Sequence, residues 1–135
     1  MAFFETSVKI DFFECDPAGV LFFGNIFRLA HKVYEEFFQD GNYERIFRNP
    51  RYAFPIVHTE ADFYAPMKFG ESYTAGLDFE PAGEKRYRVN ISFYNKAGAE
   101  AARVSMVNAV VDISTGRSVK LPGAFAELLG LDSSD

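Results

Sequence analysis

A wide apolar stripe between residues 26 and 38 constrains the fold more than any other feature of this sequence. Its spacing follows the 3.6-residue period of an α-helix and leaves only a narrow polar ribbon on the opposite side. The apolar positions are Ile26, Phe27, Leu29, Ala30, Val33, Tyr34, Phe37 and Phe38. Such a helix must be largely enclosed, because its apolar surface has to be removed from water. The rest of the chain must therefore cover it.

The rest of the chain has the pattern of β-structure. Apolar and polar residues alternate with a period of two, which indicates strands with one buried face. The expected strands cover residues 4–12, 56–65, 73–79, 87–93 and 102–111. The last run changes parity near Val107, which indicates a bulge or a strand covered on both faces. Short helices are expected at residues 43–48 and after Pro122.

The order of these elements is typical of an α+β domain. All 135 residues, 1–135, fit one domain, and a composition that is 48% apolar supplies a core without disulfides or a metal. The antiparallel sheet must bury the helix. Periodicity permits two ways to do this, a sheet curved around the helix or a flat sheet with the helix on one side.

Composition excludes several classes of protein. The formal net charge of −5 gives no global basic field, so we expect no nucleic-acid partner. Cys15 is the single cysteine, which excludes an internal disulfide, and the two histidines are not at metal-ligand spacing. No apolar run reaches the roughly 20 residues that cross a bilayer, and the N-terminus lacks a signal peptide pattern. We therefore expect a cytoplasmic protein with no membrane partner and no metal.

Asp16 lies in the most distinctive turn of the chain, an Asp-Pro-Ala-Gly sequence between the first strand and the helix, in which Gly19 permits a left-handed bend. A helix start presents free N–H groups and the positive end of the helix dipole, here at about Phe23, Gly24 and Asn25. Such donors can stabilise an oxyanion, while a nearby carboxylate activates water or attacks a carbonyl carbon. The alternative is that the Asp16 side chain only orders its turn.

The segment Asp11–Arg28 resembles the signature of the 4-hydroxybenzoyl-CoA thioesterase branch of the hotdog superfamily. The resemblance continues in residues 54–58, 62–66, 70 and 121–122, so it spans nearly the whole chain. Residues 31–35 and 54–58 are most similar to the 1,4-dihydroxy-2-naphthoyl-CoA thioesterases. The resemblance implies the hotdog fold, a curved antiparallel sheet of five or six strands wrapped around a long central helix.

The resemblance also implies a catalytic site. Asp16 would be the nucleophile or general base, and the backbone N–H groups of Phe23 and Gly24 would polarise the thioester carbonyl. Many relatives carry Tyr-His where this chain has Phe-Phe at positions 22 and 23, so any role of that histidine is absent here. Two phenylalanines suit a flat apolar acyl group, and core packing is the alternative for both. The expected substrate-binding residues are Phe22, Asn25, His31 and His58, although a purely structural role is open for each histidine.

Lys85, Arg86 and Arg88 are expected to meet the phosphates of coenzyme A, because related enzymes place basic residues at the start of this strand. From Lys85 to Lys120 there are seven basic residues and two acidic ones, whereas the chain up to residue 84 has seven basic and fourteen acidic. Lys and Arg donors match phosphate oxygens. A solvated strand face would carry the same charges, so both interpretations stay open.

The sequence therefore predicts an enzyme that hydrolyses an aromatic acyl-CoA, such as 1,4-dihydroxy-2-naphthoyl-CoA or 4-hydroxybenzoyl-CoA, to the free acid and CoA. No cofactor is expected, since coenzyme A is part of the substrate. Members of this family form homodimers or homotetramers whose active sites lie between subunits, and uncovered strand edges agree with that. The alternatives are a thioesterase for aliphatic acyl-CoA or acyl carrier protein, and a hotdog domain that binds acyl-CoA without hydrolysing it.

Overall fold

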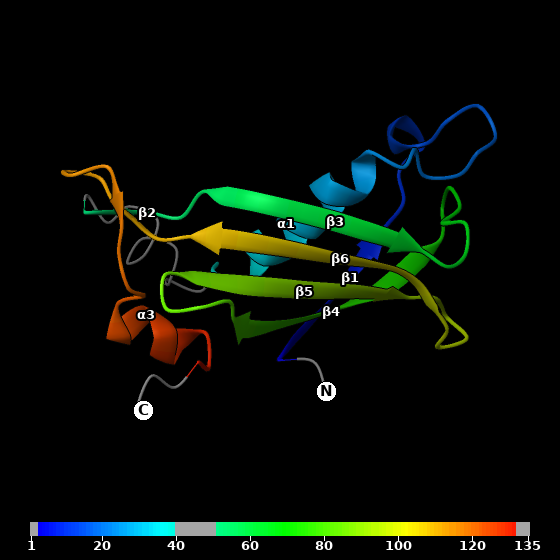
Figure 1. The fold of residues 1–135 in the computed structure, drawn as a ribbon. Helices are drawn as coiled ribbons and strands as arrows, with labels where there is room; N and C mark the ends of the chain where they lie inside the picture. Colours follow the sequence, from blue (N-terminus) through cyan, green and yellow to red (C-terminus); the bar gives the residue numbers. More distant parts are fainter. Residues whose placement is uncertain (1–2, 40–50, 132–135) are drawn as a thin grey trace.

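The computed structural model describes residues 3–39 and 51–131 and contains two antiparallel sheets. The main sheet has five strands in the order β1-β4-β5-β6-β3 (Figure 1). Its strands are β1 (Phe4–Lys9), β3 (Ile56–Phe63), β4 (Ser72–Pro81), β5 (Arg86–Tyr94) and β6 (Glu100–Ala109). The small sheet joins β2 (Tyr52–Ala53), β7 (Val111–Asp112) and β8 (Arg117–Ser118). The helical elements are η1 (Phe12–Glu14), α1 (Asn25–Phe37) and α3 (Gly123–Leu128).

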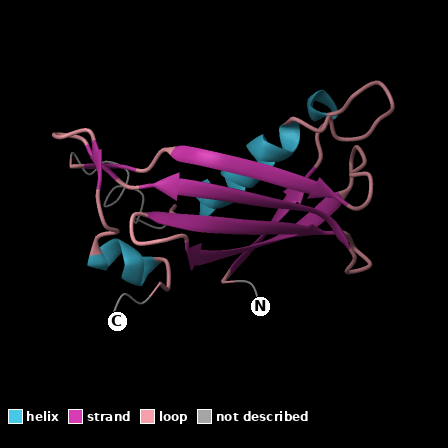
Figure 2. Ribbon diagram, in the orientation of Figure 1, coloured by secondary structure: helices cyan, strands magenta, loops and turns pink. Residues whose placement is uncertain are grey.

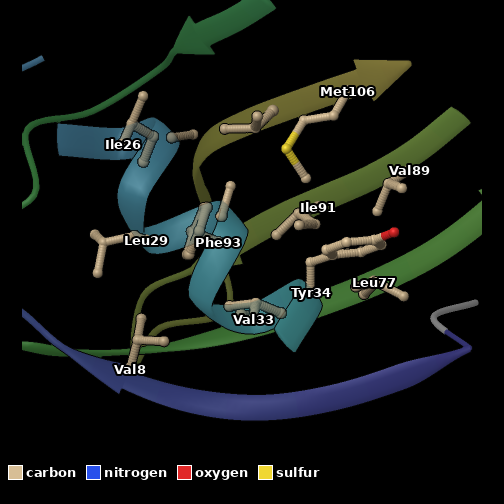
Figure 3. Packing of buried hydrophobic residues seen from close by; sticks show 14 of the residues in the cluster. Val8, Ile26, Leu29, Val33, Tyr34, Leu77, Val89, Ile91, Phe93 and Met106 are labelled. Atoms are coloured by element: carbon tan, nitrogen blue, oxygen red, sulfur yellow. The ribbon is translucent and has the colours of Figure 1, made fainter. Parts of the chain in front are cut away.

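Helix α1 lies across one face of the main sheet, as its apolar stripe requires (Figures 1 and 2). The buried residues of the helix are Ile26, Leu29, Ala30, Val33 and Tyr34. They meet alternate residues of the central strands, among them Leu77, Val89, Ile91, Phe93 and Met106 (Figure 3). Removing this much apolar surface from water is the main favourable term in the fold. The sheet and helix thus form the α+β arrangement expected from the sequence.

The expected strand alternation is confirmed most clearly in β5, where Tyr87, Val89, Ile91 and Phe93 are fully buried and their neighbours are partly exposed. The parity change expected near Val107 is also confirmed, because consecutive residues at the end of β6 are all buried. The accompanying irregularity lies in the partner strand. The β3–β6 register shifts between Ile56 and His58, so that Val57 is bulged.

Two expected strands differ from the structure in their boundaries. The first strand ends at Lys9 instead of continuing to residue 12, because the chain then turns into η1 and leaves Phe12 and Phe13 exposed. The expected strand 102–111 divides into β6 and β7. The helix after Pro122 is confirmed. The short helix expected at residues 43–48 falls outside the described residues.

A hydrogen bond between two tyrosine hydroxyls crosses the core. The hydroxyl of Tyr34, on α1, lies 2.5 Å from that of Tyr87, on β5, and both side chains are buried. Burial raises the pKa of Tyr34 and of Tyr87 above the ordinary value of 10.0, because a phenolate is poorly solvated inside the protein. Both phenols therefore stay protonated in the folded protein at a pH where an unfolded chain would lose the protons.

This difference predicts a loss of stability at alkaline pH. Above about pH 10 the unfolded state releases phenolic protons that the folded state retains, so the free energy of unfolding should fall by about 1.4 kcal/mol per pH unit for each tyrosine. Below that pH the contribution is fully present. Urea unfolding at several values between pH 8 and 11 measures it. The double variant Tyr34→Phe/Tyr87→Phe should show a shallower fall, and equal slopes would contradict this account.

Candidate active site

Asp16 lies in a loop that the backbone closes tightly. The Asp16 N–H donates to the Val20 carbonyl at 2.9 Å, and the Gly19 N–H donates to the Asp16 carbonyl at 2.9 Å. Gly19 has a φ of +79°, in the left-handed region that favours glycine, as expected for this turn. The loop also docks on the segment before β4, since the Leu21 N–H donates to Met67 at 2.7 Å. The backbone that carries the Asp16 carboxylate is therefore well fixed.

The Asp16 side chain is partly exposed and has one satisfied oxygen. Its Oδ1 accepts the N–H of Ala18 at 2.9 Å, which is the turn-ordering contact considered from the sequence. Its Oδ2 has no hydrogen-bond partner among residues 3–39 and 51–131. One oxygen thus orders the turn while the other is open to a ligand, so the two roles are compatible.

The start of α1 offers backbone donors close to this loop. The Asn25 N–H donates to the Phe22 carbonyl at 2.9 Å and the Ile26 N–H to Phe23 at 3.2 Å. Within the described part of the chain, no acceptor takes the N–H of Phe23 or Gly24. These two N–H groups carry the partial positive charge of the helix start. They are available to a negatively charged or carbonyl oxygen.

Two contacts link the Asp16 loop to these donors. The Phe22 N–H donates to the Glu14 carbonyl at 3.0 Å, and Cys15 and Leu21 form a β-bridge beside it. Asp16 follows Glu14 by two residues, and Phe23 follows Phe22 by one. The hydrogen bond between Phe22 and Glu14 therefore joins the two segments that carry Asp16 and Phe23. The rings of Phe22 and Phe23 are 48% and 65% exposed and lie 4.9 Å apart, so neither is a core residue in one protomer. This exposure disagrees with core packing, so contact with an acyl group stays the prediction for both rings.

A hollow of about 640 Å³ opens between η1, α1 and the start of β3. It is lined by Asp11, Phe13, Glu14, Phe27, Arg28, Leu29, His31, Lys32, Glu35 and Ile56. A smaller, mainly apolar hollow of about 300 Å³ is lined by Val20, Leu21 and residues 63–67. Residues shortly before Asp16 in the chain line the larger hollow and residues shortly after it line the smaller one, while Asp16 itself lines neither.

The two histidines proposed as substrate ligands lie in different places. His31 lines the larger hollow, with its Nδ1 3.4 Å from the Glu35 carboxylate. His58 pairs with Val107 of β6, and its Nε2 lies 2.9 Å from Glu60. The bulge at Val57 changes the side-chain parity, so Ile56 rather than His58 faces the helix. One protomer therefore does not bring His58 to the hollow that His31 lines.

Asn25 and Glu14 occupy the base of the loop. The Asn25 amide donates from Nδ2 to the Glu14 carbonyl at 2.8 Å, so it is engaged by the protein itself. Glu14 is 7% exposed, and its carboxylate accepts the Asp11 N–H at 2.8 Å. The sequence interpretation missed Glu14. The spacing of Asp11 and Glu14 is that of a capping box, which could have identified it.

The three basic residues expected at coenzyme A differ in their surroundings. Lys85 and Arg86 are exposed, whereas Arg88 donates from Nη1 to Ser105 at 2.7 Å and lies 3.4 Å from Glu80. Arg86 begins β5, and eight residue steps of about 3.3 Å, or about 26 Å, separate it from the end of the strand that faces the Asp16 loop. Figure 1 shows that the two ends of β5 lie at opposite ends of the sheet. One protomer does not bring them together.

Cys15 is a poor nucleophile in this setting. Burial, followed by the charges of Glu14 and Asp16, raises the pKa of the Cys15 thiol above its usual value of 9.0, which disfavours the reactive thiolate.

Among the described residues no group of three or more His, Cys, Asp or Glu is arranged to hold a metal ion. No helix in the described ranges is long and apolar enough to cross a membrane.

Comparison with known proteins identifies the family. Residues 10–129 match the family model described as the thioesterase-like superfamily. A 1,4-dihydroxy-2-naphthoyl-CoA hydrolase from Nostoc punctiforme is 29% identical over 130 residues, covering 93% of this chain and 86% of its own length. A second protein of that name, from Trichodesmium erythraeum, is 32% identical over 100 residues, covering 71% and 72%.

Solved structures agree in fold. A putative thioesterase from Prochlorococcus marinus superposes with a TM-score of 0.85 at 25% identity, covering 96% of this chain and 95% of its own. A 1,4-dihydroxy-2-naphthoyl-CoA thioesterase from Synechocystis gives a TM-score of 0.84 at 20% identity, covering 94% and 95%. The curved-sheet arrangement expected from the resemblance is thereby confirmed. With its fold, its loop and its matched residues taken together, this chain belongs to the thioesterase-like superfamily and is a thioester hydrolase of the hotdog fold.

Proposed function

We propose that this enzyme hydrolyses an aromatic acyl-CoA, and that 1,4-dihydroxy-2-naphthoyl-CoA is the substrate to test first. The relatives of that name support the choice of substrate. The observation that carries the proposal is that the open Oδ2 of Asp16 and the unpaired N–H groups of Phe23 and Gly24 belong to backbone segments joined by the hydrogen bond between Phe22 and Glu14. A thioester needs both a base or nucleophile and an oxyanion donor, and this loop offers both.

In this mechanism the carbonyl oxygen of the thioester accepts hydrogen bonds from the Phe23 and Gly24 N–H groups. The Asp16 carboxylate then attacks the carbonyl carbon to give an acyl-enzyme anhydride that water cleaves, or it takes a proton from the attacking water. Either route breaks the carbon–sulfur bond and releases the CoA thiol and the free acid. Charge that develops on the carbonyl oxygen is stabilised by the helix start, which is pre-organised before the substrate arrives.

The larger hollow is suited to the acyl group. Its volume of about 640 Å³ falls within the usual range for small-molecule sites. The rings of Phe13 and Phe27 offer apolar contact to a flat arene, and Arg28, His31 and Lys32 offer donors to ring hydroxyl groups. A plain aliphatic chain would form no hydrogen bonds with these donors, which favours the aromatic substrate over the aliphatic alternative.

A second copy of the chain would complete the site. Strand β3 is at an edge of the sheet, and seven of its eight residues are exposed, including Ile56, Val57 and Phe63 at 43%, 45% and 45%. Antiparallel pairing of two β3 edges about a two-fold axis would turn the partner's sheet end for end. That rotation would bring the partner's start of β5 toward the Asp16 end, which supports a shared site in a homodimer and leaves a homotetramer as its extension.

Substitution of Asp16 tests the catalytic assignment. We expect Asp16→Asn to lower kcat about 100-fold or more on 1,4-dihydroxy-2-naphthoyl-CoA, with folding intact, because the amide can neither attack nor accept a proton. Turnover of aromatic and aliphatic acyl-CoA and of acyl carrier protein thioesters should be measured side by side. Asp78→Asn, also half-buried but on β4, is the control. A loss below threefold would leave the catalytic role of Asp16 unsupported, and no turnover of any thioester by the wild type would favour a binding domain.

The binding of coenzyme A depends on charge in this proposal. We expect Arg86→Ala to raise KM several-fold while changing kcat less, and to make KM less sensitive to salt, because an exposed cation acts on phosphates through a screened field. Arg117→Ala removes an exposed cation from β8 and serves as the matched control. KM values measured between about 20 and 300 mM salt give the comparison. Equal salt dependence in the wild type and in Arg86→Ala would contradict the role.

The oligomeric state tests the role of the β3 edge. We expect the wild type to sediment as a dimer or tetramer, and Val57→Lys to dissociate it, because a lysine at an edge strand opposes edge-to-edge pairing. Val57→Thr keeps the β-branched shape and should leave the assembly intact. Sedimentation velocity at micromolar concentration provides the masses. If the wild type were monomeric at about 100 μM, the dissociation constant of the dimer would lie above roughly 10⁻⁴ M. That result would rule out this assembly.

A further inference from the structure

The carbonyl of Glu14 is a shared acceptor at the junction of the loop and the helix. It accepts the N–H of Phe22 at 3.0 Å and the Nδ2 of Asn25 at 2.8 Å. Phe22 closes the loop that carries Asp16, and Asn25 is the first residue of α1. One carbonyl oxygen therefore ties the loop to the helix at the point where the two halves of the site meet.

The Glu14 side chain stabilises the turn that precedes this junction. Its carboxylate is buried and accepts the Asp11 N–H at 2.8 Å, which closes the turn η1 at its N-cap. A buried carboxylate costs free energy unless it is hydrogen-bonded, so this contact matters for the turn. Asp16 follows Glu14 by two residues in the chain. The contacts that hold Glu14 therefore also affect the direction of the backbone at Asp16.

The Asn25 amide is engaged by the protein itself. Its Nδ2 donates to the Glu14 carbonyl at 2.8 Å, and the residue is half-buried. Asn25 is the first residue of α1 and not its N-cap, which is Gly24. Its hydrogen bond to Glu14 is therefore the bridge from α1 to the loop.

We propose that Asn25 and Glu14 are positioning residues that hold the Asp16 carboxylate in register with the Phe23 and Gly24 N–H groups. This inference rests on the proposed function of Asp16. The Asn25 amide and the Glu14 carbonyl form the side-chain link between the helix that carries the donors and the loop that carries the carboxylate. Its loss lets the loop move relative to the helix, and misplacement of a reacting group by about 1 Å can cost about 100-fold in rate.

Asn25→Asp separates positioning from folding. The substitution keeps the size of the side chain and puts a carboxylate in the first turn of α1, where the helix dipole stabilises it, so the fold should survive. It replaces the donor by an acceptor that repels the Glu14 carbonyl. We expect kcat to fall about 10- to 100-fold with KM changed by less than about threefold, because the substrate contacts stay. Asn25→Ala should act in the same direction, and thermal unfolding should show both variants folded.

A double-mutant cycle with Asp16→Asn shows whether Asn25 acts through Asp16. If it does, adding Asn25→Asp to Asp16→Asn should change the residual rate by less than about twofold, because there is no carboxylate left to position. Asn90→Ala is the matched control. It removes two amide hydrogen bonds, to Asp78 and Glu80, from a half-buried asparagine on β5, and kcat should not change.

The outcomes distinguish this inference from the proposed function. A large loss in Asp16→Asn with less than twofold loss in Asn25→Asp overturns the positioning role alone. So does an effect on KM rather than kcat, which would make Asn25 a substrate ligand, and so do additive losses in the cycle. An Asp16→Asn variant with full activity removes the catalytic assignment and the positioning role with it.

Discussion

Burial of the apolar face of α1 against β4, β5 and β6 is the interaction on which the rest of the structure depends. This packing removes Ile26, Leu29 and Val33 from water and covers buried residues on the inner face of the sheet. Because this packing fixes the helix axis, it also fixes where the helix starts. The N–H groups of Phe23 and Gly24 are therefore held by the core even though they lie at the surface.

The proposed catalytic groups lie where this core ends. A loop closed by backbone hydrogen bonds carries Asp16, and the start of α1 supplies unpaired donors, so a negative oxygen and a positive helix terminus share one junction. The junction is stabilised by Glu14 and Asn25, whose hydrogen bonds are internal. Groups that are open to a ligand and groups that hold them are thus different residues, although they are neighbours in the chain.

One protomer leaves this site only partly enclosed. The rings of Phe22 and Phe23 are exposed, and the strand that borders the larger hollow, β3, has an unpaired edge in the described part of the chain. Arg86, at the far end of β5, cannot reach the Asp16 loop of its own protomer. The second copy that we propose to pair at β3 would cover this apolar surface and bring the distant cation closer.

The sequence by itself determined the helix, the strands and the turn of the loop that carries Asp16. A period of 3.6 at residues 26–38 and a period of two in β5 are local properties, and so is the turn that Gly19 permits, which is why these predictions were confirmed. The side on which His58 points was decided only by the tertiary structure. The bulge at Val57 arises from pairing with β6, about fifty residues later in the chain, and no local pattern encodes it. The engagement of Asn25 by Glu14 has the same origin, because a hydrogen bond across the loop exists only once the core has set the helix beside it.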